Sequence, residues 1–147
     1  MNLRGAFLCA HEVMGAIKDR EYGRIVDVSS VSGKRPVPDR APYTSSKAGM
    51  LGLTRTLAAE GGPHGVTANA MCPGSVRGPR IEATIENHAA ATDRSPEELR
   101  REKVDDTLGE SFVESTDVAS LVAYRCSDAA SSVTGQAINI SKRKVIY

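Results

Sequence analysis

The sequence predicts a single-domain α/β fold, a parallel sheet with helices on both faces, on three observations. Short β-branched apolar runs recur along the chain, segments with helical apolar spacing lie between them, and glycine or proline residues separate the two kinds of segment. A helix between two strands is a βαβ unit, whose strands run parallel. At 147 residues the chain can form one core and is too short for two ordinary domains.

The first predicted element is an amphipathic helix over residues 2–20. His11 and Glu12 interrupt its apolar residues, and no A-x-A cleavage site follows, so this segment is not expected to be a targeting peptide. The apolar side chains that share one helical face are Leu3, Phe7, Ala10, Val13, Met14 and Ile17.

The next elements form the βαβ unit. A strand over Ile25–Ser29 is followed by a loop over residues 31–42, which is rich in proline and contains Gly33. Residues 43–60 then predict a helix that is apolar around most of its circumference and is therefore covered on two sides. Two glycines and a proline end this helix, and residues 66–71 predict the second strand.

The second half of the chain predicts a helical excursion, a helix and a strand. Residues 79–113 are polar and charged, and a capping box at Ser95–Glu98 predicts a helix start within them. Thr116 or Asp117 is expected to cap a helix that ends near residue 127, and residues 137–140 predict a third strand. Three strands make a thin sheet with an unpaired edge.

Composition excludes several classes of function. A formal net charge of +1 provides no strong field for nucleic acid or a membrane surface, and no apolar run approaches the roughly 20 residues that span a bilayer. The three cysteines have no C-x-x-C spacing, which is typical of free thiols in a reducing compartment, so a cytoplasmic location is expected.

The candidate site lies where the strands end, because open α/β sheets bind ligands beyond the carboxyl ends of their strands. Ser30 ends the first strand, and the helix that follows begins with Tyr43 and, one turn later, Lys47. Residues four apart share a helix face, so the phenol and the ammonium can both point toward Ser30.

These residue types suit acid–base chemistry. A lysine charge near a tyrosine favours the phenolate, so the tyrosine can exchange a proton with an alcohol or carbonyl oxygen near neutral pH. A serine hydroxyl on a rigid strand end can donate a hydrogen bond to the same oxygen. None of these side chains transfers a hydride, so redox chemistry would require an organic cofactor.

Several ordered motifs together resemble the short-chain dehydrogenase/reductase family, in its single-domain ketoreductase-like branch. The resemblance extends to about Ile140, and the spacing of thirteen residues from Ser30 to Tyr43 is usual in the family. The motifs are Asn2–Phe7 (NLRGAF), Gly23–Ser30 (GRIVDVSS), Tyr43–Ala48 (YTSSKA), Gly52–Ala58 (GLTRTLA), Asn69–Gly74 (NAMCPG), and Ser127–Asp128 with Thr134–Gln136 (TGQ).

The resemblance implies a role for each matching residue in a reaction between NAD or NADP and a secondary alcohol or ketone. Tyr43 matches the catalytic acid/base, and Lys47 matches the residue that favours its ionised form and holds the nicotinamide ribose. Ser30 matches the serine that orients the substrate oxygen, and Asn2 matches the asparagine that holds a water in the proton relay. The segment along the nicotinamide matches Pro73, Gly74 and the backbone of Val76.

The resemblance also implies a Rossmann-like fold of which this chain is the C-terminal portion, with residues 79–113 as the variable substrate lid. The glycine-rich phosphate loop of the family does not occur in residues 1–147, so the choice between NAD and NADP cannot be read. Gly78 stands where the family often has a threonine that binds the carboxamide. Residues 141–147 depart from the usual family ending, and the basic run Lys142–Lys144 predicts a solvated tail.

The sequence gives weaker support to functions other than an oxidoreductase. The scattered histidines predict no metal site, and a serine hydrolase is disfavoured because the sequence has no G-x-S-x-G elbow. The alternative is a truncated, inactive remnant that at most binds a partner through the helix over residues 43–59. The resemblance further implies a dimer or tetramer that packs through the helices over residues 2–20 and 43–60.

Overall fold

The computed structural model describes residues 2–147 and contains a three-stranded sheet in the order β1-β2-β3. The strands are β1 (Gly23–Val28), β2 (Val66–Pro73) and β3 (Ala137–Ile140). Both pairs are parallel, with Gly23 opposite Val66 and Ala70 opposite Ala137. The predicted parallel sheet of three strands is confirmed, and β1 and β3 form its two edges.

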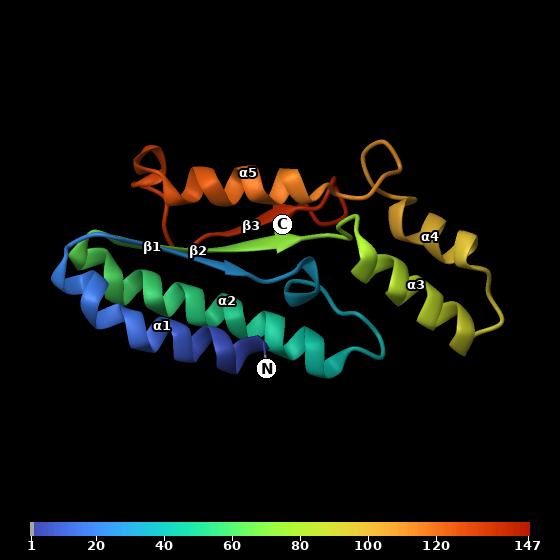
Figure 1. Ribbon diagram of the computed structural model, residues 1–147, viewed down its shortest axis with the longest axis horizontal. Coiled ribbons are helices and arrows are strands. Elements are labelled where there is room, and N and C mark those ends of the chain that lie inside the picture. The colour runs from blue at the N-terminus through green and yellow to red at the C-terminus, as the bar shows by residue number, and fades with distance from the viewer. Residues whose placement is uncertain (1) are drawn as a thin grey trace.

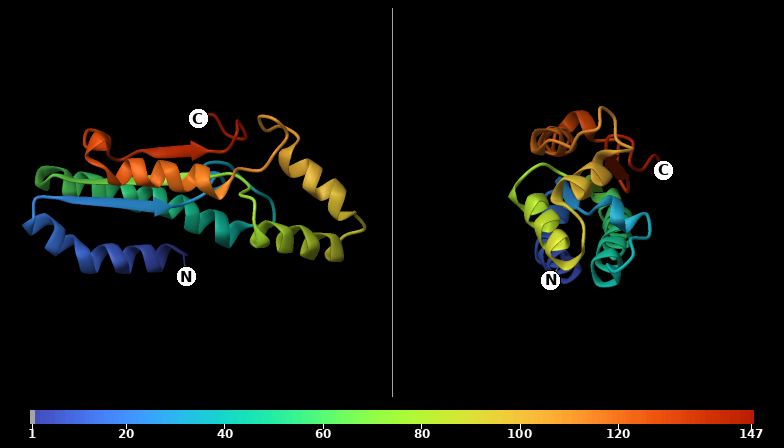
Figure 2. Two further views of the ribbon diagram at one scale, coloured as in Figure 1. Left: turned by 45° about the horizontal axis from the view of Figure 1, so that its top comes forward. Right: turned by 90° about the vertical axis from the view of Figure 1, so that its right-hand side faces the viewer.

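Helices cover both faces of the sheet, as the sequence predicts. Helices α1 (Asn2–Asp19) and α2 (Ala41–Gly61) lie on one face, and α5 (Ser115–Cys126) lies on the other (Figure 1). Helices α3 (Pro79–Ala91) and α4 (Pro96–Val104) form a hairpin beyond one end of the strands (Figure 2). Three short 3₁₀ turns complete the set, η1 (Val31–Gly33), η2 (Gly62–His64) and η3 (Asp128–Ala130).

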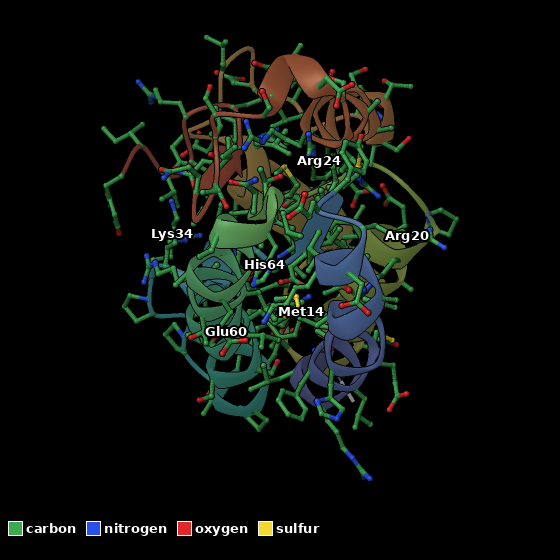
Figure 3. All side chains as sticks on the ribbon, turned by 90° about the vertical axis from the view of Figure 1, so that its left-hand side faces the viewer. Met14, Arg20, Arg24, Lys34, Glu60 and His64 are labelled. Atoms are coloured by element: carbon green, nitrogen blue, oxygen red, sulfur yellow. The ribbon has the colours of Figure 1, made fainter. Side chains whose placement is uncertain are left out.

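The core is centred on β2, whose eight residues are all buried because layers lie on both of its faces. Met14 of α1 packs toward α2 (Figure 3) and, with Leu57 and Ala68, forms the cluster between the two helices and the sheet. A second cluster contains Val31, Leu51, Ala70, Cys72 and Val145.

Polar side chains tie the turn before β3 to the middle of β2. The buried Asn69 side chain donates to the carbonyl of Val133 at 2.9 Å and accepts from the N–H of Gln136 at 3.1 Å. The Thr134 hydroxyl accepts from the N–H of Ala68 at 3.0 Å. These contacts give a structural reason for the Asn69 and Thr134–Gln136 motifs, because they fix where β3 joins the sheet.

Most element boundaries move by one or two residues from their predicted places. Helix α2 begins at Ala41 because Pro42, expected in the loop, is tolerated in a first helical turn that needs no N–H partner. The start of α5 differs from the prediction, since Asp117 lies inside the helix and its carboxylate accepts from the N–H of Glu114 at 3.0 Å. The capping box at Ser95 and Glu98 is confirmed.

The prediction that the basic run Lys142–Lys144 is a solvated tail is wrong. Val145 is 4% exposed and belongs to the core cluster with Val31 and Cys72. The Lys144 side chain is 16% exposed and forms an ion pair with Asp106 of the excursion. Charge patterning alone suggested solvent exposure, whereas the apolar residue after the basic run draws the segment onto the core.

Two further observations concern compartment and membrane. Cys9, Cys72 and Cys126 are free thiols, as the sequence predicts, while the cytoplasmic location stays a prediction. None of the helices between residues 2 and 147 is both long and apolar enough to cross a bilayer.

Candidate active site

The first two turns of α2 place Tyr43 and Lys47 on one face at the carboxyl end of β1. The Lys47 Nζ donates to the carbonyl of Val28, the last residue of β1, at 2.7 Å. The same nitrogen lies 5.9 Å from the centre of the Tyr43 ring and 3.7 Å from Met50 Sδ. The ammonium is therefore held between the strand end and the phenol, which is the juxtaposition that the spacing of four residues predicts.

Two buried serines after β1 connect the strand to α2. The Ser29 hydroxyl donates to the backbone carbonyl of Lys47 at 2.8 Å. Ser30 begins η1, and its Oγ accepts from the N–H of Ser32 at 3.1 Å. Accepting this bond leaves the Ser30 hydroxyl proton free to donate to another oxygen.

Gly33 allows η1 to lie directly against the helix. A Cβ at this position would come within 2.8 Å of both the carbonyl carbon and the carbonyl oxygen of Lys47. Any side chain at Gly33 would therefore push the turn that follows Ser30 away from α2. The close backbone contact explains how Ser30 and Lys47, 17 positions apart in sequence, belong to one small region.

Asn2 reaches the same helix through Ser46. Its side-chain amide donates to the Ser46 hydroxyl at 3.2 Å, and that hydroxyl donates to the backbone carbonyl of Tyr43 at 2.7 Å. Asn2 thus lies on the side of α2 next to the Tyr43–Lys47 turn. Its place in a water relay stays a prediction.

A buried carboxylate beneath Lys47 was missed by sequence reasoning. Asp27 in β1 is 8% exposed, and its Oδ2 lies 2.7 Å from the hydroxyl of Thr54, which also lies 2.8 Å from the carbonyl of Met50. Burial raises the pKa of Asp27, and the Thr54 hydrogen bond and the Lys47 charge oppose this effect. An acidic residue inside an otherwise apolar strand, with Thr54 two turns after Lys47, was the available signal.

The end of β2 forms the other wall of the region. Pro73 is buried as the last strand residue, and the N–H of Gly74 donates to the carbonyl of Ile140 at 3.0 Å. A Cβ at Gly74 would meet Ser141 Cα at 3.2 Å, so the two strand ends are closely packed. Val76 then forms an isolated parallel bridge with Val113, where the excursion over residues 79–113 leaves and rejoins the body.

The excursion approaches the start of α2. Burial lowers the pKa of Lys103 in α4, and the charge of Arg40, the residue just before α2, lowers it further. Arg40 therefore lies within electrostatic range of Lys103 and precedes Tyr43 by three positions.

The structure brings Ser30, Tyr43 and Lys47 into one region with Asn2 beside it, and it places Pro73, Gly74 and Val76 at the adjacent strand end. A phenol, an ammonium and a free hydroxyl proton can donate to a carbonyl oxygen, which is the chemistry of a proton transfer. Within residues 2–147 no group of three or more His, Cys, Asp or Glu side chains could hold a metal ion.

Several known proteins match this chain over most of its length. A family model described as enoyl-(acyl carrier protein) reductase matches residues 1–142. A protein named as the ketoacyl reductase of the monensin polyketide synthase of Streptomyces virginiae is 39% identical over 142 residues, which are 95% of this chain and 54% of the relative. The acetoacetyl-CoA reductase of Shinella zoogloeoides is 34% identical over 139 residues, 94% of this chain and 53% of the relative.

Solved structures with the same fold match nearly the whole chain. The actinorhodin polyketide ketoreductase, solved with NADPH, matches 100% of this chain and 57% of its own length with a TM-score of 0.93 and 34% identity. An NAD⁺-bound xylitol dehydrogenase matches 96% of this chain and 56% of its own length with a TM-score of 0.89 and 25% identity. The predicted Rossmann-like fold and the predicted family resemblance are confirmed, and the chain spans about half the length of the curated relatives it matches.

Proposed function

The chain belongs to the short-chain dehydrogenase/reductase family, and from this premise we propose that it is an NAD(P)-dependent oxidoreductase that interconverts a ketone and a secondary alcohol. The observation that supports the proposal most is the position of Lys47, whose ammonium binds the end of β1 at 2.7 Å beside the Tyr43 ring. We also propose that residues 1–147 form the C-terminal portion of one domain, with residues 79–113 as its substrate lid.

In the reducing direction, the Tyr43 hydroxyl donates a proton to the carbonyl oxygen of the substrate as that oxygen becomes an alcohol. The Ser30 hydroxyl donates a hydrogen bond to the same oxygen, because its lone pair is engaged by the Ser32 N–H while its proton is free. In the oxidising direction, Tyr43 accepts the alcohol proton. Proton transfer from a positioned group of this kind contributes about 10²- to 10⁴-fold to a rate.

Lys47 acts on Tyr43 through charge and position. Its ammonium stabilises the phenolate that forms when Tyr43 gives up its proton. The contact with Val28 fixes the side chain, so no rotamer freedom is lost when the substrate binds. We propose that Asn2 orients a water that returns a proton to this region, and its hydrogen bond to Ser46, which is bonded to the Tyr43 carbonyl, supports this role.

The residues present fit the nicotinamide end of a dinucleotide cofactor, which when bound supplies the hydride. An ammonium has three protons, and Lys47 directs one to Val28 and another toward Met50, so the third is available for a ribose hydroxyl. Tyr43 is half-buried beside it. Pro73, Gly74 and the backbone of Val76 would lie along the ring.

The substrate class follows from the relatives. The proteins matched over nearly the whole chain are named as ketoacyl and acetoacetyl-CoA reductases. We therefore propose 3-oxoacyl thioesters as the first substrates to examine. The lid residues would determine which acyl group is accepted.

Cofactor binding by the chain as it stands tests this proposal. We expect saturable binding of NADPH or NADH in a calorimetric titration, and about 10- to 100-fold weaker binding by Lys47→Ala, the loss typical of a hydrogen bond to a charged group. Lys18→Ala on α1 is the matched control and should bind like the wild type. Equal binding by Lys47→Ala and the wild type would refute the placement of the ribose.

The alternative is an inactive remnant that at most binds a partner through residues 43–59. Two observations favour it for the isolated chain. Within residues 2–147 no strand pairs with the outer edge of β1, and the matched relatives are nearly twice as long. Absence of both NADPH and NADH binding in the same titration would select this alternative.

We further propose that the chain forms a dimer or tetramer through α1 and α2. A hollow of about 230 Å³ lies between these two helices. It is lined by Phe7, Ala10, His11, Met14, Leu53, Thr56, Leu57 and Glu60, of which Met14 and Glu60 are labelled in Figure 3. Phe7 and Val13 are about half exposed, and apolar surface of this kind favours association.

A further inference from the structure

The excursion that forms the proposed lid is a small unit with its own core. Helices α3 and α4 pack on each other around Ile85, Leu99 and Phe112, all of which are buried. Glu82 and Arg100 join the two helices by an ion pair of 2.6 Å. The hairpin extends beyond the strand ends, away from the other helices (Figures 1 and 2). Its position relative to the site must therefore be set by its attachments to the body.

The first attachment is the isolated parallel bridge between Val76 and Val113 at the base of the hairpin. The N–H of Arg77 donates to the carbonyl of Val113 at 2.8 Å, and the N–H of Val113 donates to the carbonyl of Ser75 at 2.9 Å. The Arg77 side chain also forms an ion pair of 2.8 Å with Glu114. These contacts fix the base of the hairpin, whereas its two helices extend beyond them (Figure 2).

The second attachment is the segment after β3, which binds the end of α4 and the turn that follows it. The N–H of Leu108 donates to the carbonyl of Lys142 at 2.7 Å, and the Lys142 ammonium donates to the Ser111 hydroxyl at 2.7 Å. The Lys144 ammonium pairs with the Asp106 carboxylate and lies 3.4 Å from the carbonyl of Glu102.

The same segment is fixed to the core on its other side. Val145 is 4% exposed and packs in the cluster that contains Val31, the residue after Ser30. The N–H of Val145 donates to the Ser141 hydroxyl at 3.2 Å, and the Asn139 side chain donates to the carbonyl of Val145 at 3.0 Å. The segment therefore connects the hairpin to the cluster on which the Ser30 turn rests.

We propose that residues 141–145 are a clasp that fixes the lid over the active site, and that Lys144 is a positioning residue for substrate binding through its contact with Asp106. The part that concerns the substrate rests on the proposed function, whereas the clasp itself does not. The hydrogen bond from Lys144 lowers the pKa of Asp106, which is consistent with an ionised pair. The Lys144 side chain is 16% exposed and that of Asp106 is 53% exposed, so the lysine is the more buried partner of the pair.

Charge reversal tests the clasp in the full chain. We expect Lys144→Glu to raise the amide hydrogen-exchange rates of residues 105–111 by about tenfold, the effect of losing one charged hydrogen bond. The double variant Lys144→Glu with Asp106→Lys re-forms the pair with the charges exchanged and should restore slow exchange, as should the conservative Lys144→Arg. Arg20→Glu is the control and should leave these rates unchanged, because Arg20 follows α1 at the end of the molecule opposite to the hairpin (Figure 1).

Kinetics distinguish the clasp from the proposed function. If both hold, Lys144→Glu raises the KM for a 3-oxoacyl thioester several-fold with little change in kcat, since the chemical groups stay in place. If Lys144→Glu shows faster exchange in residues 105–111 but the wild type shows no turnover, the clasp is supported and the proposed function is rejected. Unchanged exchange in Lys144→Glu, or exchange that the double variant does not restore, would overturn the clasp even in an active enzyme.

Discussion

Lys47 is the residue on which the site depends, because its backbone and its side chain are fixed by different partners. Its carbonyl accepts from Ser29, its ammonium binds Val28, and Gly33 packs on its backbone. The motif residues Ser30, Tyr43 and Lys47 could be found from the sequence, since their spacing and the resemblance point to the same chemistry. The roles of Ser29, Asp27 and Thr54 were not predicted, because they depend on which side chains the packing of α2 on β1 brings together, and the acidic residue inside an apolar strand was the one signal for Asp27.

The buried carboxyl group of Asp27 predicts how the free energy of unfolding depends on pH. Because burial holds the pKa of Asp27 above its unfolded value, the folded state keeps this proton to higher pH than the unfolded state does. The free energy of unfolding should therefore fall as pH rises from about 4 through the folded pKa, by about 1.4 kcal/mol for each pKa unit.

Asp27→Asn should remove this part of the pH dependence, since an amide does not ionise and can still hydrogen-bond to Thr54. Urea unfolding at pH 5 and pH 8 measures the effect, with Asp39→Asn on an exposed loop as the control. We expect Asp27→Asn to be more stable than the wild type at pH 8 and to lose this advantage as the pH is lowered. A variant less stable than the wild type at both pH values would contradict the assignment.

Helices and strands were largely predictable, because apolar spacing, glycine breaks and the Ser95 capping box are local signals. The errors lie where tertiary contacts decide the outcome. Pro42 lies in the first turn of α2 and not in the preceding loop. The basic segment around Lys144 contacts the core and the proposed lid and is not fully solvated. A hydropathy pattern cannot reveal that Val145 packs against Val31 and Cys72, since these residues come from elements distant in the sequence.

Helices α1 and α2 form the proposed interface between subunits, and this interface predicts the mass of the protein in solution. Sedimentation velocity should give a mass of two or four times the 15.6 kDa of the chain. Phe7→Lys, at a side chain 51% exposed, should shift the protein toward the monomer, because the variant places a charge in an apolar contact. Leu108→Lys on the lid, where the leucine is 72% exposed, should not. A wild-type monomer, or a Phe7→Lys variant of unchanged mass, would contradict the proposed interface.

At the scale of the whole molecule, the parallel direction of the three strands follows from the order of elements, since helices connect successive strands. The position of the site at the carboxyl ends follows from the same topology. The attachment of the proposed lid could not be predicted. It depends on contacts between residues 102–111 and 141–145, which are far apart in the sequence.

The most direct measurement is the rate at which Tyr43→Phe oxidises NADPH with a 3-oxoacyl thioester, compared with the wild type. The substitution removes only the hydroxyl that we assign as proton donor. We expect turnover by the wild type and a loss of about 10²- to 10⁴-fold in kcat for Tyr43→Phe, with cofactor binding retained. Equal rates for the two proteins would contradict the account.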